Sequence, residues 1–372
     1  MLKTKSETTV FVGMSGGVDS SVAAALLVEQ GYRVIGVTMK LWQRSAKEMF
    51  LPENEKGCCS VSAVNDAKLV CEHLGIRHLI FDFHSDFNHW VIDNFTREYM
   101  QGRTPNPCVI CNARIKWEGF LARVREMGGD WIATGHFARV DFDPQTNRYR
   151  LLKSPNTWKD QSYVLWGLSQ DSLAHTILPV GELTKSEVRA LAVKFGLKTA
   201  QKQESQEICF IPDNNYARFL KDRFPNVTRK LAKGAIRDRR GNFLGNHSGY
   251  PFYTIGQRKG LGIALGEPVY VSEIRPQSNE IIVGRKEELY KPGLIAEKLN
   301  WISMDRLESK RRAFVKIRYK DPGSFGWIEP IDNGNVKVTF EKPQRAVTPG
   351  QSVVFYENDI VLGGGIIQES IS

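Results

Sequence analysis

A glycine-rich segment near the N-terminus carries the strongest chemical signal of the sequence. Ser15-Gly16-Gly17-Val18-Asp19-Ser20-Ser21 lies between an apolar run at 8–14 and a helical pattern at 20–30. Adjacent glycines let backbone N–H groups converge on an anion, and the start of a helix adds partial positive charge. The serine hydroxyls can donate to phosphate, and the Asp19 carboxylate is suited to hold Mg²⁺ or to orient the loop. Neither GxxxxGK[ST] nor GxGxxG occurs, which disfavours γ-phosphate transfer and dinucleotide binding.

Cysteines form the second chemical group. Cys108-Val-Ile-Cys111 directly precedes a helical stretch, where thiol pKa values are lowered, and Cys209 follows much later in the chain. Two distant thiols near a phosphate site suit sulfur transfer, in which one carries a persulfide sulfur and the other resolves the resulting disulfide. A CxxC is also half of a zinc site, with Cys58, Cys59 or Cys209 as the other ligands. Cys108, Cys111 and Cys209 could instead hold an iron–sulfur cluster. We assign no residue to a resident metal.

Alternating strands and helices must position these groups. The pattern predicts a parallel sheet with covering helices, from strands at 8–14, 33–39, 78–83 and 130–135 and helices at 20–30, 61–74, 86–100, 112–127 and 184–195, the last opened by a capping box at Thr184. After about residue 216, short β-rich runs such as 313–319 and 336–340 take over. We predict an α/β N-terminal domain (1–215), a small β-rich central domain (216–283) and a C-terminal β-barrel (284–372).

Charge is spread unevenly along the chain. Its 372 residues include 51 Lys and Arg against 41 Asp and Glu, a net charge of +10. Residues 216–283 hold 12 basic and 5 acidic residues, whereas residues 1–215 hold 25 and 24. Such an excess predicts a polyanionic partner, nucleic acid first, bound mainly by the central domain. The sequence shows no apolar run of about 18 residues and no targeting presequence, so we expect a cytoplasmic protein without a membrane anchor.

Several motifs resemble one known family. The glycine-rich segment resembles the PP-loop of ATP pyrophosphatases, which cleave ATP between the α- and β-phosphates and adenylate a substrate. Successive segments then resemble motifs of the tRNA-specific 2-thiouridylase family: MSGGVDSSVAA, GRTPNPCVICNARIKW, ATGHFAR, KDQSYVLWGL, SQEICFI, YTIGQRKGLGI and TPGQSVVFY. They run from residue 14 to residue 356, so the resemblance covers essentially the whole chain. It implies an adenine nucleotide alpha hydrolase-like N-terminal domain and ATP-dependent 2-thiolation of the wobble uridine of tRNA, with release of AMP and pyrophosphate.

The resemblance also implies roles for single residues. ATP and Mg²⁺ would be bound by Gly13, Met14, Ser15, Gly16, Gly17, Val18, Asp19, Ser20, Met39 and Gly135. Cys111 matches the family's nucleophile and Cys209 its persulfide-bearing cysteine, and the two can form a transient disulfide. Contacts with tRNA would come from Asn106, Pro107, Cys108, His136, Lys159, Asp160, Gln161, Arg318, Tyr319 and Gln351. Sulfur would arrive from an upstream persulfide carrier protein or a cysteine desulfurase.

One position departs from the family pattern, and other functions stay open. Many members have Asp where this chain has Cys108, which weakens an acid/base role there and leaves a ligand role open. A PP-loop ligase or amidotransferase would act on another nucleotide or tRNA with ammonia or lysine as nucleophile, and would not need the cysteines. A zinc-stabilised RNA-binding protein would consume no ATP. An iron–sulfur-dependent form of the same thiolation is a further alternative.

Overall fold

The N-terminal domain is built on a parallel sheet. The computed structural model describes residues 3–42, 60–202, 208–211, 213–231 and 233–371, and in these ranges five strands lie in the order β3-β2-β1-β4-β7. These strands span Arg77–Asp82, Arg33–Lys40, Thr9–Gly13, Trp131–Ala133 and Thr176–Ile177. Every neighbouring pair is parallel. The carboxyl ends of β2, β1 and β4 therefore meet at one edge, where sheets of this kind bind ligands.

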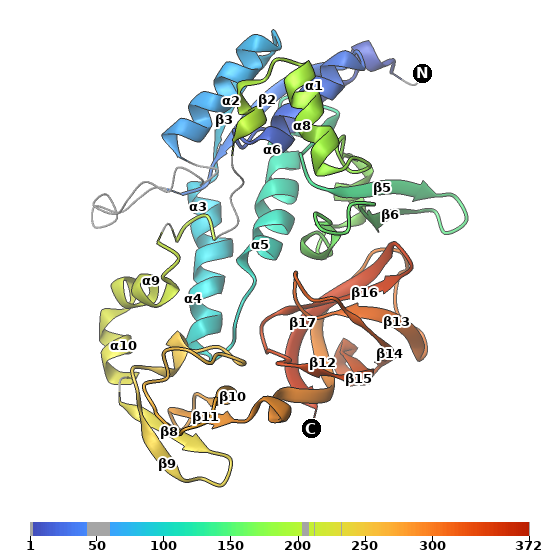
Figure 1. Cartoon of the computed structure of the whole chain (residues 1–372). Helices are drawn as coiled ribbons and strands as arrows, with labels where there is room; N and C mark the ends of the chain where they lie inside the picture. The colour runs from blue at the N-terminus through green and yellow to red at the C-terminus, as the bar shows by residue number, and fades with distance from the viewer. Residues whose placement is uncertain (1–2, 43–59, 203–207, 212, 232, 372) are drawn as a thin grey trace.

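Helices cover both faces of this sheet (Figure 1). Val10 and Val12 of β1 pack with helices α1 (Val18–Glu29), α2 (Val61–His73) and α8 (Lys185–Lys194). Phe11, which points to the other face, packs in a second cluster with the long helical segments at 84–100 and 107–126. Burial on both faces explains why β1 is a continuous apolar run rather than an alternating one.

The two long helical segments of the second face are each interrupted by a π-helical turn. The first consists of α3 (His84–Phe87), a π-helical stretch at Asn88–Ile92 and α4 (Asp93–Met100). The second consists of α5 (Pro107–Ile110), a π-helical stretch at Cys111–Gly119 and α6 (Phe120–Glu126). Such wider turns often occur at functional sites, and the second one begins at a predicted site residue.

The central domain combines two short helices with a small sheet. Helices α9 (Tyr216–Arg223) and α10 (Pro225–Leu231) come first. The sheet follows in the order β10-β11-β8-β9, with strands Tyr270–Arg275, Glu280–Gly284, Gly234–Asp238 and Phe243–His247. The sequence pattern missed both helices, because helices of one or two turns show little periodicity and depend on tertiary packing. In α9 that packing comes from the buried side chains Phe219 and Leu220.

The C-terminal domain is a closed barrel, as the sequence predicted. Its strands are β12 (Tyr290–Trp301), β13 (Arg311–Lys316), β14 (Ser324–Pro330), β15 (Val336–Arg345), β16 (Ser352–Glu357) and β17 (Ile360–Ile371). They follow the order β12-β15-β14-β13-β16-β17, and pairing between β12 and β17 closes the ring. Closure leaves no free strand edge within the ring.

A hairpin of the N-terminal domain extends the barrel sheet. It consists of β5 (Ala138–Asp143) and β6 (Arg148–Lys153), which pair antiparallel. Leu152 of β6 pairs with Ile360 of β17, so the sheet continues from one domain into the other. No sequence pattern indicated this junction, because the paired residues lie in segments far apart along the chain.

Candidate functional site

The phosphate loop, residues 13–20, leaves the carboxyl end of β1 and leads into α1. Its first peptide is tied to β2, since Met14 N donates to Val37 O at 2.7 Å and Thr38 Oγ1 donates to Met14 O at 3.1 Å. Gly16 has a φ of +67°, and a Cβ placed on it would lie 2.2 Å from the carbonyl oxygen of Ala63. Only glycine therefore fits at this point, where the loop backbone lies against the first turn of α2.

Two serine hydroxyls stabilise the loop from within. Ser20 Oγ donates to Gly17 O at 3.1 Å and accepts from Ser15 N at 3.2 Å, and Ser21 Oγ donates to Gly17 O at 2.8 Å. Both Ser20 and Ser21 are buried, whereas Ser15 is exposed. We expected all three hydroxyls to face phosphate. In the structure the two buried hydroxyls fix the loop's shape, and the exposed Ser15 has its Oγ 3.3 Å from Ser20 Oγ.

An ion pair holds the carboxylate of Asp19 beside the loop. Lys185 Nζ lies 2.5 Å from Asp19 Oδ1, and their side chains are 15% and 29% exposed. The same ammonium lies 5.7 Å from the centre of the Phe137 ring. This ion pair places an ammonium group and a carboxylate, a group that can bind Mg²⁺, next to Gly16 and Gly17. Such an arrangement suits a phosphate-binding site. Sequence reasoning missed Lys185: the capping box at Thr184 located the start of α8, but no local pattern relates that start to α1.

The other predicted nucleotide-binding residues lie at the same edge of the sheet. Met39 comes near the end of β2, and its Cε would be 3.1 Å from a Cβ on Gly13. Gly135 follows β4, and a Cβ there would lie 2.6 Å from Ser20 N. The structure thus brings Met39 and Gly135 to opposite sides of the loop. Met14 and Val18 are buried in the core, so they offer backbone rather than side chain.

His136 lies next to this edge, where its surroundings disfavour the charged form of the ring. Its Nδ1 is 2.8 Å from Thr134 Oγ1, and its ring centre is 5.2 Å from that of Trp117. Burial, with a smaller contribution from the charge of Lys116, lowers the pKa of His136 to about 3. A neutral imidazole can accept or donate one hydrogen bond but cannot neutralise phosphate.

The predicted nucleophile stands at the junction between α5 and the following π-helical turn. Asn106 caps this helical segment, since its Oδ1 accepts from Cys108 N at 3.2 Å. Cys108, in the first turn, is exposed, whereas Cys111 is buried. The backbone N–H groups of a helix start favour a thiolate, so both positions suit sulfur chemistry. The neighbouring Asn112 is also buried, and its Nδ2 donates to Val164 O at 3.0 Å.

The remaining cysteines differ in how deeply they are buried. Cys209 is half-buried and packs against the same hydrophobic cluster that contains Cys111. Cys71 is fully buried in α2, and burial raises the pKa of its thiol to about 11, so it stays protonated and inert. Cys58 and Cys59 lie outside the described residues. In the described ranges, no group of three or more Cys, His, Asp or Glu side chains is arranged to hold a metal ion.

Hydrogen bonds to neighbouring residues hold the segment Lys159–Gln161 in place. The Asp160 carboxylate is buried and accepts hydrogen bonds from Ser154 N and from both N and Oγ of Ser162. Burial raises the pKa of Asp160, and these hydrogen bonds oppose that shift. Gln161 binds Phe137 twice, since its Oε1 accepts from Phe137 N and its N donates to Phe137 O, both at 2.8 Å. Asp160 and Gln161 thus hold the segment in place, and Lys159 is the cationic residue beside them.

The barrel residues predicted to contact tRNA lie close to the N-terminal domain. Arg318 Nη1 donates to Ala346 O at 3.3 Å, and the Tyr319 ring lies 6.2 Å from that of Tyr163. Gln351 Nε2 donates to Thr104 O at 2.8 Å, directly before the segment Asn106–Cys108. Three of the predicted tRNA-binding segments therefore meet where the barrel contacts the N-terminal domain.

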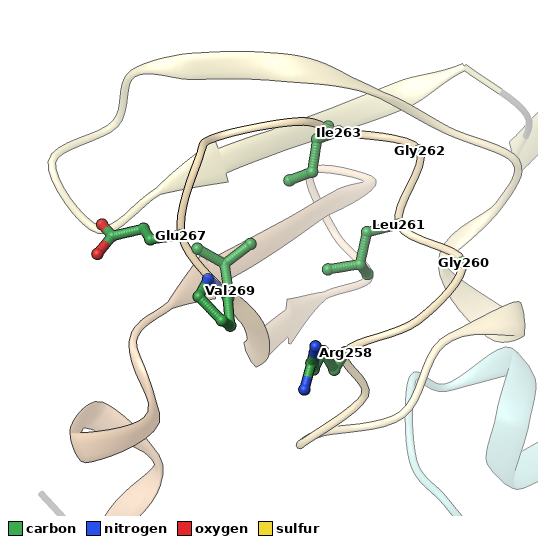
Figure 2. A pocket seen from close by; sticks show the side chains of 8 residues that line it. Arg258, Gly260, Leu261, Gly262, Ile263, Glu267 and Val269 are labelled. Carbon is green, nitrogen blue, oxygen red and sulfur yellow. The ribbon is translucent and has the colours of Figure 1, made fainter.

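The basic residues of the central domain lie on its helices and strands as well as on its turns. Arg239 and Arg240 are exposed in the turn between β8 and β9, where the charge of Arg240 contributes to lowering the pKa of Asp238. Arg237 differs, because its Nε donates to Glu280 at 2.7 Å. Figure 2 shows a glycine-rich loop arching around a pocket that has Arg258 and Glu267 among its lining residues. The volume of this pocket is about 240 Å³. This pocket belongs to the central domain and is separate from the phosphate loop.

Comparison with known proteins agrees with this arrangement. Family profiles described as "tRNA methyl transferase HUP domain", "tRNA methyl transferase PRC-barrel domain" and "Aminomethyltransferase beta-barrel domain" match residues 8–213, 218–285 and 291–367. The chain is 50% identical to the tRNA-specific 2-thiouridylase MnmA of Carboxydothermus hydrogenoformans, over 97% of this chain and 98% of that protein. It is 51% identical to the MnmA of Lachnoclostridium phytofermentans, over 96% of this chain and 99% of that protein. No helix within the described residues is long and apolar enough to cross a membrane.

Proposed function

The chain belongs to the tRNA-specific 2-thiouridylase family, and we propose that it replaces the C2 oxygen of the wobble uridine of tRNA with sulfur, using ATP to activate that oxygen. Its relatives are sulfurtransferases that modify tRNA. The observation that carries the proposal is the combination, in one α/β domain, of a phosphate loop with a capped helix that presents Cys108 and Cys111. Residues 1–215 would carry the chemistry, and residues 216–283 and 284–372 would hold the tRNA.

The phosphate loop fits the triphosphate of ATP. Gly16 brings the loop backbone to a place where a side chain would collide with Ala63, so this turn depends on glycine. The N-terminus of α1 adds its partial positive charge. Lys185 can neutralise charge on the departing pyrophosphate, and the Asp19 carboxylate can hold Mg²⁺. Mg²⁺ would supply charge neutralisation of the phosphates when bound.

Adenylation turns the C2 oxygen into a leaving group. In the proposed first step this oxygen attacks the α-phosphorus of ATP, the P–O bond to the β-phosphate breaks, and pyrophosphate leaves. Gly135 and Met39 would flank the adenosine, because both lie at the sheet edge that carries the loop. Asn106 would contact the base, since it lies just before the exposed Cys108, whereas the side chain of Pro107 is buried.

Sulfur transfer then uses Cys209 and Cys111. The terminal sulfur of a persulfide on Cys209 forms a bond to C2, and AMP leaves with the former C2 oxygen. The Cys111 thiolate attacks the inner persulfide sulfur, so the S–S bond breaks and a Cys111–Cys209 disulfide forms. A thiol reductant restores both thiols, and an upstream carrier protein or a cysteine desulfurase reloads Cys209. The half-buried position of Cys209 leaves access for such a donor.

Binding of tRNA would use the contact region between the barrel and the N-terminal domain. Lys159, Arg318 and Tyr319 supply cations and a ring there, which suits the RNA backbone and an unstacked base. The neutral His136 and the amide of Gln351 can hydrogen-bond to RNA but cannot neutralise its phosphate charge. The exposed arginines of the central domain would extend the electrostatic contact.

One reaction tests the proposal. The protein is incubated with ATP, Mg²⁺, a persulfide donor and unmodified tRNA, and the tRNA is digested and analysed for 2-thiouridine. We expect product with the wild type and none with Cys111→Ser or Cys209→Ser. Cys71→Ala is the matched control, because Cys71 is buried far from solvent in α2 and should leave activity unchanged. Absence of product from the wild type, or full activity of both serine variants, would contradict sulfur transfer by these thiols. Iron and sulfide analysis of anaerobically purified protein tests the cluster-dependent alternative.

A further inference from the structure

The chain that leads into the cysteine helix is contacted by both other domains. Residues 101–106 connect α4 with α5 and run between the central domain and the barrel (Figure 1). On the central-domain side, Tyr250 OH donates to Met100 O at 2.6 Å, and a Cβ on Gly102 would lie 2.6 Å from Pro276 Cγ. The segment therefore begins at a close-packed contact with the central domain.

The barrel holds the next two residues by their backbone. Thr104 N donates to Pro349 O at 2.8 Å, and Gln351 Nε2 donates to Thr104 O at 2.8 Å and to Pro105 O at 3.3 Å. A Cβ on Gly350 would lie 2.9 Å from Thr104 N, so the barrel turn lies directly on this backbone. Hydrogen bonds to both the N–H and the carbonyl of one residue leave its peptide little freedom to rotate.

Arg103 connects the N-terminal domain with the barrel through one guanidinium. Its Nε donates to Glu98 of α4 at 2.7 Å, and its Nη2 donates to Glu297 of β12 at 2.7 Å and to Ile367 O of β17 at 3.4 Å. The side chains of Arg103, Glu98 and Glu297 are 18%, 8% and 22% exposed. A guanidinium held by two carboxylates at low exposure has a fixed orientation, which a single exposed ion pair does not provide.

We propose that Arg103 is a positioning residue for the cysteine helix, through which the barrel fixes the approach to Cys108 and Cys111. Only four residues separate Arg103 from Cys108, and two of them are prolines. Because the intervening backbone is held at Thr104 and capped at Asn106, a shift of the barrel relative to α4 moves the start of α5. The barrel is thus a support for the thiols as well as a tRNA-binding surface. This inference rests on the proposed function only for its activity readout.

A second arginine offers a matched control. Arg148 of β6 also joins the N-terminal domain to the barrel: its Nε donates to Ile302 O at 2.9 Å, and its guanidinium pairs with Asp305. Its side chain is 18% exposed, the same as that of Arg103. Arg103→Ala and Arg148→Ala therefore each remove an arginine that joins the N-terminal domain to the barrel, although the Asp305 partner of Arg148 is 89% exposed. Only Arg103 lies in the segment that leads to the cysteines.

The test compares thiol protection and turnover in these variants. Iodoacetamide labelling, resolved by peptide mass spectrometry, should show faster modification of Cys111 in Arg103→Ala than in the wild type or in Arg148→Ala. The rate of 2-thiouridine formation should fall by about ten- to a hundredfold in Arg103→Ala with the KM for ATP unchanged, as expected for misplaced reacting groups. Equal labelling and equal turnover in the two variants would overturn the proposal.

A milder variant distinguishes a loss of positioning from a loss of folding. Glu297→Gln weakens only the barrel side of the contact and keeps the Arg103–Glu98 pair, so it should shift Cys111 labelling in the same direction by a smaller factor. Unchanged labelling in Glu297→Gln would also contradict the proposal. The labelling readout needs no tRNA. A wild type that forms no 2-thiouridine but shows these labelling changes would refute the proposed function and leave the positioning role intact.

Discussion

Two glycines at the ends of α1 allow the steric cost of adding a side chain to be measured separately from its conformational cost. Gly16 and Gly31 lie near the two ends of α1, and both have positive φ, +67° and +84°. A Cβ on Gly31 meets no heavy atom within 4 Å, whereas a Cβ on Gly16 would lie 2.2 Å from Ala63 O. Gly31→Ala should therefore cost only the left-handed backbone conformation, about 1–2 kcal/mol of unfolding free energy.

Gly16→Ala should cost more and should also impair the site. The collision adds about 1–3 kcal/mol of overpacking to the same conformational cost, so unfolding free energy should fall by about 2–5 kcal/mol. Relief of the collision moves the loop backbone away from α2 and misaligns its N–H groups. ATP affinity should then fall by about tenfold or more, or about 1.4 kcal/mol.

Urea unfolding and calorimetric titration with Mg·ATP measure the two effects. Gly31→Ala should bind ATP as the wild type does, because it changes only the far end of α1. An undiminished ATP affinity in Gly16→Ala would refute the assignment of this loop as the triphosphate site. Equal losses of ATP affinity in the two variants would show that the loss reflects stability of α1 rather than the shape of the loop.

Three further predictions concern charge. Lys185→Met should weaken ATP binding by about tenfold in calorimetric titration, whereas Lys194→Met, on the same helix but 62% exposed, should not; equal affinities would exclude phosphate contact. Replacing Arg239 and Arg240 together by Gln should reduce the slope of log K against log salt for tRNA by about 2 and leave ATP binding unchanged, and an unchanged slope would assign these charges to solubility. His136, whose pKa falls to about 3 in the folded state, should make the protein less stable as pH drops below about 6.5, by up to about 1.4 kcal/mol per pH unit, because only the unfolded chain then binds the proton. Tm measured from pH 5 to 7.5 should show a shallower slope in His136→Gln, and parallel profiles would contradict a lowered pKa of His136.

Local signals explain why much of the N-terminal domain was predictable. A buried apolar run followed by two glycines and a helix start specifies a strand, a loop and a helix within about twenty residues. The capping box at Thr184 is equally local, and the structure confirms it, since Glu187 N donates to Thr184 Oγ1 at 3.3 Å and Thr184 N donates to Glu187 Oε2 at 2.7 Å. Such features depend on neighbouring residues and not on how the domains assemble.

Contacts between remote segments were not predictable for the opposite reason. Asp19 and Lys185 are 166 residues apart, and Arg103 and Glu297 are 194 apart. Each pair joins side chains of common types, so neither member stands out from the other charges in its part of the sequence. The roles carried over from the family resemblance had the same limit. They named Gln351 as a tRNA contact, and they did not indicate that its side chain binds the backbone that leads to the cysteines.

The hairpin shared between two domains has a consequence for how the protein is made. β6 cannot pair with β17 until Ile360, the partner of Leu152, has been synthesised. During synthesis at about 5–20 residues per second, that delay is roughly ten to forty seconds, in which a newly made strand edge is open to other chains on the ribosome. Charged side chains along the hairpin counter this hazard, and Arg150 pairs there with Asp141 at 2.6 Å. A nascent chain that stops before the barrel would keep this edge exposed, so truncated products should be the aggregating species in the cell.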